Sequence, residues 1–155
     1  MAKTYTREEA LLKMAGLCAR SEQCESDVAR KLRACGLPAA DIRLVIEELV
    51  SRNFIDHRRF AAAFARDKVR FSSWGKMKIR AALFAKRIPE NLINEAMEEI
   101  DADDYRAAAM RSARSAALSL DLGEQSGRQK LFRRLMSRGF EPDVVSMAVR
   151  ELLGR

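Results

Sequence analysis

Basic side chains are concentrated in residues 57–88, where they favour electrostatic binding over catalysis. This stretch holds ten Lys and Arg residues against a single acid, Asp67, and carries a formal charge of +9, although the whole chain of 155 residues carries only +7. A cationic surface of this density attracts nucleic-acid phosphates or an acidic protein surface. The candidate binding residues are Arg58, Arg59, Arg66, Lys68, Arg70, Lys76, Lys78, Arg80, Lys86 and Arg87.

Helical spacing arranges part of this charge into two ridges on consecutive helices, which could line one groove. A charge run is also typical of an ordinary solvated helix face, so both interpretations stay open at this point. The ridges consist of Arg59, Arg66 and Arg70 on the first helix, and of Lys76, Arg80 and Arg87 on the second.

Two smaller features extend this candidate surface. Trp74 lies between the basic helices, next to Gly75, and would either stack on a base or a partner's side chain or pack as a lid over a small core. An acid-free cluster in residues 128–138, which also contains Arg133, adds the candidates Arg128, Lys130, Arg134 and Arg138.

Catalytic, metal and cofactor chemistry is poorly supported. The only histidine, His57, follows Asp56 at a predicted helix start, where a capping or surface role is expected. Acidic pairs are sequential neighbours that do not converge on a helix surface, and no Gly-rich phosphate loop is present. The spacing of Cys18, Cys24 and Cys35 fits no zinc pattern, which favours reduced thiols. We expect a protein without enzymatic activity, metal or cofactor.

The elements that must position these residues are helices. Ala, Leu and Arg dominate the sequence, whereas Gly, Pro and β-branched residues are scarce, which favours an all-α fold. No apolar run is long enough to span a bilayer, and the first residues do not resemble a signal peptide. We therefore expect a cytoplasmic, monomeric protein that does not bind membranes.

The sequence contains an internal repeat. Residues 26–49, 77–100 and 129–152 align without gaps, their apolar columns coincide, and Pro38, Pro89 and Pro142 interrupt them at nearly the same column. Each segment reads as two helices preceded by a third. The predicted architecture is an elongated or curved tandem array of three three-helix repeats, at residues 1–53, 54–100 and 101–155.

Local signals place the leading helix of each repeat. Thr6 and Glu9 form a capping box at the start of the first helix, and a second box is expected at Ser126 and Gln129. The helix that starts near Asp56 carries an apolar stripe, and the leading helix of the third repeat covers roughly residues 103–119. The expected members of the stripe are Phe60, Phe64 and Phe71.

Several of these segments resemble the RecX family of bacterial recombinase regulators over nearly the whole chain. The stretch CESDVARKL and the stretch NFIDHRRFAAAFARDKVRFSSWGKMKIRAALFAKRI carry the likeness. The sequence departs from the family pattern at Cys24, where Ser is usual as a helix cap, and at Lys76, where Pro is common. The matching features are Lys31-Leu32, Phe54-Ile55-Asp56 with Phe60, Trp74-Gly75, Lys78-Ile79-Arg80 and Leu83.

The resemblance implies a non-enzymatic modulator that binds the RecA recombinase filament on single-stranded DNA. Such a protein would inhibit the recombinase ATPase, strand exchange and filament growth, in DNA repair, recombination and the SOS response, with weak electrostatic contact to the DNA. The basic residues named above come from the charge map, not from the family. The alternative is a DNA-binding module whose helix-turn-helix-like repeats act without the recombinase.

Overall fold

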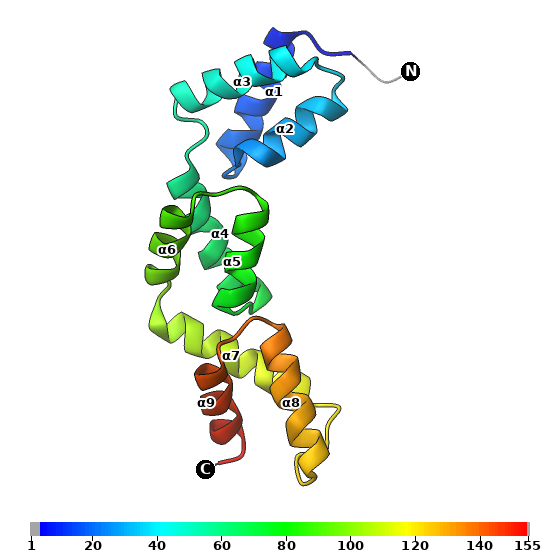
Figure 1. Ribbon diagram of the computed structural model, residues 1–155, viewed down its shortest axis with the longest axis vertical. Coiled ribbons are helices and arrows are strands. Elements are labelled where there is room, and N and C mark those ends of the chain that lie inside the picture. The colour runs from blue at the N-terminus through cyan, green and yellow to red at the C-terminus, as the bar shows by residue number, and fades with distance from the viewer. Residues whose placement is uncertain (1–3, 155) are drawn as a thin grey trace.

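The computed structural model describes residues 4–154, which form an all-helical array with no strand. The first unit contains α1 (Arg7–Arg20), α2 (Glu25–Ala34) and α3 (Ala39–Ser51). The second contains α4 (His57–Ser72), α5 (Lys76–Ala85) and α6 (Glu90–Glu98). The third contains α7 (Ala102–Ala117), α8 (Gln125–Ser137) and α9 (Pro142–Leu152). The units follow one another along the longest axis of the molecule, so the predicted elongated array of three-helix repeats is confirmed (Figure 1).

The apolar columns of the repeat are core positions in every unit. The aligned residue at the centre of the middle helix is buried in all three units, and so is the aligned residue one turn earlier. Burial at matching positions explains why the three segments share their spacing, since each middle helix presents the same face to its unit's core. These two columns are Leu32, Leu83 and Leu135, and Val28, Ile79 and Leu131.

The turn after each middle helix is also shared. Its central residue has a left-handed backbone, at Gly36 (φ 82°), Arg87 (φ 62°) and Gly139 (φ 95°). In each case the residue that follows donates its N–H to a carbonyl in the last turn of the helix: Leu37 to Leu32, Ile88 to Leu83, and Phe140 to Leu135. A helix that ends in a left-handed residue of this kind usually has glycine at that position. Arg87 is therefore a non-glycine residue at a position where the other two repeats have glycine.

The apolar core has two parts. Residues of the first unit form a cluster of their own, whereas those of the second and third units form one continuous cluster that also includes Cys24. No helix within residues 4–154 is long and apolar enough to cross a membrane.

Helix starts and faces follow the sequence with two exceptions. The Thr6–Glu9 capping box is confirmed, with Glu9 N–H donating to Thr6 Oγ1. The box at Ser126 and Gln129 was wrong, because α8 begins one residue before Ser126, with Glu124 as its N-cap. Phe71 was also wrongly placed in the core, since it is 82% exposed.

Candidate partner and nucleic-acid interface

Four of the ten cations in residues 57–88 are held by carboxylates from other elements. Arg58 Nε lies 2.8 Å from Glu95 Oε2, Arg59 Nε 2.7 Å from Glu22 Oε1, Arg70 Nε 2.9 Å from Asp104 Oδ2, and Lys86 Nζ 2.8 Å from Asp27 Oδ2. The partners come from all three units. These side chains therefore tie helices together, and their charge is largely compensated inside the molecule.

The pKa values of these groups reflect the pairing. The hydrogen bond from Arg58 lowers the pKa of the Glu95 carboxyl, and the same bond raises the pKa of Arg58. Burial alone would raise the pKa of Asp27, but hydrogen bonds from Lys86 and Cys24 outweigh it and hold the pKa below its ordinary value. Asp27 therefore stays ionised beside Lys86.

A second group of cations gathers around aromatic rings. Lys68 Nζ lies 4.7 Å and Lys78 Nζ 4.5 Å from the centroid of the Trp74 ring. Trp74 also contacts Phe64 edge-on and packs against the core while staying half-buried, so it takes the lid position, one of the two arrangements that the sequence left open. A ring attracts a cation without neutralising it. Lys68 and Lys78 therefore bring uncompensated positive charge to one aromatic centre.

The remaining cations of the second unit are more open. Lys76 Nζ lies over the Tyr105 ring, 4.9 Å from its centroid. Among the described residues, the one ion pair of Arg66 is with its chain neighbour Asp67, at 3.8 Å. Arg80 donates to the neutral amide oxygen of Asn94 at 2.6 Å. Within residues 4–154, Arg87 makes neither a hydrogen bond through its side chain nor an ion pair.

The two predicted ridges differ from the expected arrangement. Arg66 and Arg70 line a cavity of about 120 Å³ whose other walls come from α6, the α6–α7 turn and α7, not from α5. Arg87 does not continue the face of α5, because the helix ends at Ala85 and Arg87 lies in the left-handed turn beyond it. The expectation of a second ridge running through Arg87 was therefore wrong.

In the third unit the nominated cations also divide into two kinds. Arg128 donates to the carbonyls of Leu122 and Gly123 in the loop before α8. Arg134 donates to the carbonyl of Ala116 in the last turn of α7 and to Ser119 Oγ in the loop, so both side chains fix this loop. The side chains of Lys130 and Arg138 are exposed on α8 and at its end. Of the four candidates, Lys130 and Arg138 have no side-chain hydrogen bond or ion pair within residues 4–154, so they are open to an external partner.

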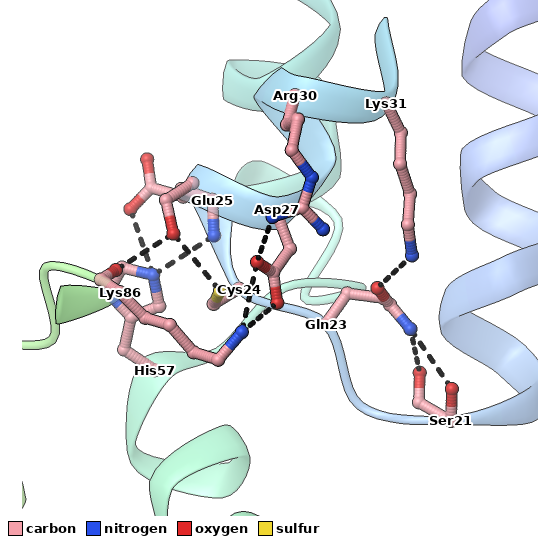
Figure 2. Close-up of polar contacts among 10 residues, drawn as sticks. Ser21, Gln23, Cys24, Glu25, Asp27, Arg30, Lys31, His57 and Lys86 are labelled. Carbon is pink, nitrogen blue, oxygen red and sulfur yellow. Dashed lines mark hydrogen bonds and ion pairs between the residues drawn. The ribbon is translucent and has the colours of Figure 1, made fainter. Parts of the chain in front are cut away.

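His57 has one of the two roles expected of it, a capping contact, but at the start of a different helix from its own. Its Nε2 accepts a hydrogen bond from Glu25 N–H at 3.3 Å, so it closes the start of α2 across the junction of two units (Figure 2). Among the described residues no group of His, Cys, Asp and Glu is arranged to hold a metal ion.

The fold and this surface define a class of protein: an all-helical repeat array with cations and a half-buried tryptophan on its middle unit. The family model described as "RecX, second three-helix domain" matches residues 56–97. Over these residues the chain is similar to the RecX family, so the resemblance predicted from the sequence is confirmed.

Individual relatives extend the match along the chain. Regulatory protein RecX of Prosthecochloris aestuarii is 29% identical over 153 residues, which are 99% of each chain. Regulatory protein RecX of Vibrio campbellii is 29% identical and covers 96% of this chain and 92% of its own. The similarity to these relatives therefore extends over nearly the whole chain.

Two solved structures have the same fold. A crystal structure of regulatory protein RecX covers 92% of this chain and 70% of its own, with a TM-score of 0.78 and 23% identity. The crystal structure of RecX from Lactobacillus salivarius matches 96% of this chain and 97% of its own chain, with a TM-score of 0.76 and 19% identity.

Proposed function

We propose that this protein binds the RecA recombinase filament on single-stranded DNA and inhibits its ATPase, strand exchange and growth. The protein would act in the cytoplasm as a monomer, without catalysis of its own. The three repeats, at residues 1–53, 54–100 and 101–155, would contribute unequally, with the second unit supplying the main electrostatic contact.

The observation that carries the proposal is the convergence of Lys68 and Lys78 on Trp74. Both ammonium groups lie within 5 Å of the ring centroid, and neither has a carboxylate partner within the described chain. Two uncompensated positive charges beside one ring favour an anion close to that ring. A DNA phosphate or an acidic side chain of the filament fits that requirement.

The shape of the molecule supports the same function. An elongated array presents a long surface relative to its mass, which suits a partner that is itself a long polymer (Figure 1). The exposed cations Lys130 and Arg138 lie on the neighbouring unit and would extend the contact along the filament.

The test is the recombinase ATPase on single-stranded DNA, measured with wild-type protein and with the double variant Lys68→Glu/Lys78→Glu. The variant should need at least about tenfold more protein for the same inhibition, because each reversal replaces attraction with repulsion. The matched control is Arg7→Glu/Arg43→Glu, which reverses two exposed charges of the first unit and should inhibit like wild type.

The alternative function, DNA binding without recombinase, predicts a different result. In that case the protein would bind naked single-stranded DNA as tightly as it binds the filament, and its affinity would fall steeply with salt. Equal inhibition by the Lys68/Lys78 variant and by wild type would show that this surface is an ordinary solvated face.

A further inference from the structure

The outer face of α5 is apolar although no part of the described chain covers it. Met77 is 53% exposed and Phe84 is 76% exposed, while Ile79 and Leu83, on the opposite side of the same helix, are fully buried. Met77, Ala81 and Phe84 are spaced i, i+4 and i+7 and share one face. A surface helix ordinarily has a polar outer face. Large exposed apolar side chains at helical spacing are typical of an interaction site.

The other two repeats show that the repeat itself does not require this face. At the positions equivalent to Met77 and Ala81, α2 has Ser26 and Arg30, and α8 has Gln129 and Arg133. The position equivalent to Phe84 is Arg33 in α2 and a partly buried Met136 in α8. The exposed apolar stripe is therefore particular to the second unit.

Positive charge borders this stripe. Arg80 lies on the same side of α5 and donates to the neutral Asn94 amide oxygen, and Arg87 follows the end of the helix. Neither arginine has an acidic partner within residues 4–154. Arg87 keeps its left-handed backbone although glycine occupies that position in the other two repeats. Strain of this kind at an exposed residue points to a function for the side chain.

We infer that the outer face of α5 is a protein-docking surface whose partner is an apolar groove with an acidic rim. Met77 and Phe84 would enter the groove, and Arg80 and Arg87 would meet the carboxylates at its edge, as in other complexes of a helix with a groove. The stripe favours a protein over a nucleic acid, because Phe84 supplies its one ring, whereas Met77 and Ala81 have none to stack on successive bases. The inference rests on the proposed function and assigns this surface to the protein part of the filament.

The test compares the full-length double variant Met77→Ser/Phe84→Ser with wild type in binding to recombinase filaments, at about 50 mM and about 200 mM salt. The variant should bind at least about tenfold more weakly, because central apolar anchors dominate interface energies. The loss should be similar at both salt concentrations, since burial of apolar groups is not screened. Leu12→Ser, on the exposed side of α1, is the matched control and should bind like wild type.

The outcomes separate this inference from the proposed function. Failure of the wild-type protein to bind the filament would overturn the proposed function itself. Wild-type binding together with unchanged binding by the variant would overturn only the docking surface. An equal loss of binding to naked single-stranded DNA, or the loss of a wild-type dimer in sedimentation, would also overturn it, since the face would then contact bases or a second copy of the chain.

Discussion

The junction between the first and second units and the junction between the second and third units use equivalent positions of the repeat. In each junction, the start of one unit's middle helix meets the end of the middle helix of the next unit. At the first junction the start of α2, at Ser26, contacts Lys86 after α5. At the second, Gly75 and Met77 at the start of α5 contact Arg138 and Gly139 after α8. A side chain from the following leading helix accepts a hydrogen bond from the first residue of the middle helix. His57 accepts from Glu25 N–H, and Tyr105 from Lys76 N–H.

The second junction is made largely by backbone. Gly75 N–H donates to Arg138 O at 2.8 Å, and Met77 N–H donates to Gly139 O at 2.9 Å. A Cβ on Gly75 would lie 2.2 Å from the Gly139 carbonyl carbon, so only glycine permits this approach. Tyr105 also donates to Glu141, and burial strongly raises the pKa of its hydroxyl, which keeps the proton in place. The free N–H groups at the start of α5 are thereby satisfied by the third unit.

The first junction has side chains where the second has glycines. Cys24 stands at the position equivalent to Gly75, and Arg87 at the position equivalent to Gly139. The first junction is held by a hydrogen bond from Ser26 Oγ to Lys86 O at 2.9 Å and by the Lys86–Asp27 ion pair (Figure 2). Glu22 Oε2 is buried without a partner in the described chain. The apolar cores do not merge apart from Cys24. The same repeat therefore yields a second and a third unit that share one apolar core, and a first unit that is attached to them mainly through polar side chains.

The largest effects should come from the core leucines, and they should differ between the two regions. Leu83→Ala and Leu32→Ala should each cost about 2 to 5 kcal/mol, because both side chains are fully buried. Leu83→Ala should destabilise the second and third units together, whereas Leu32→Ala should unfold the first unit alone. Hydrogen exchange followed by mass spectrometry resolves the units, and a uniform loss of protection in Leu32→Ala would contradict two separate cores.

Gly75→Ala should cost about 3 kcal/mol, since its methyl group would overlap the backbone of Gly139. Chemical denaturation followed by circular dichroism measures this loss. Gly16→Ala is the control, because nothing lies within 4 Å of a Cβ there, and alanine in the middle of α1 should stabilise the protein by about 0.5 to 1 kcal/mol. Equal effects of the two variants would show that the units are not in backbone contact.

Arg87→Gly should stabilise the protein by about 1 kcal/mol, because a left-handed backbone is unfavourable for a residue with a Cβ. The other two repeats have glycine at this position. The same variant should bind recombinase filaments more weakly if Arg87 borders the docking face of α5. Thermal melting and filament binding measured on one preparation separate the two effects. A variant that is destabilised, or that binds more tightly, would count against this account of Arg87.

The smallest effect concerns the ion pair of the first junction and depends on pH. Because the pKa of Asp27 in the folded protein lies below its ordinary value of 3.8, the pair stabilises the fold above that value. This contribution is lost as pH falls through the lower folded pKa. Asp27→Asn should remove about 1 kcal/mol or less near neutral pH, because the pair is partly exposed, and little at about pH 2. Asp67→Asn is the surface control in melting experiments at both pH values.

Much of the architecture could be predicted because helix formation and the core faces of helices are local properties. The spacing of apolar residues was enough to predict the buried positions that the repeats share. The Thr6–Glu9 cap could be predicted because its two residues are only three apart in the sequence. The errors arose where a neighbouring segment decides the outcome. The α8 start depends on the loop that packs before it, and Phe71 lies at the end of α4, where the stripe continues past the part of the helix that contacts the core.

The sequence by itself determined that the protein is an array of helical repeats with its positive charge in the second unit, since composition, period and charge are properties of the chain. Tertiary structure alone decided which cations are free. Arg58, Arg59, Arg70 and Lys86 are neutralised by acids 34 to 59 residues away. Lys68, Lys78 and Arg87 have no acidic partner in the described part of the chain. It also decided that Met77 and Phe84 face solvent. Charge compensation and burial depend on distances through space, and these become fixed only when the units pack.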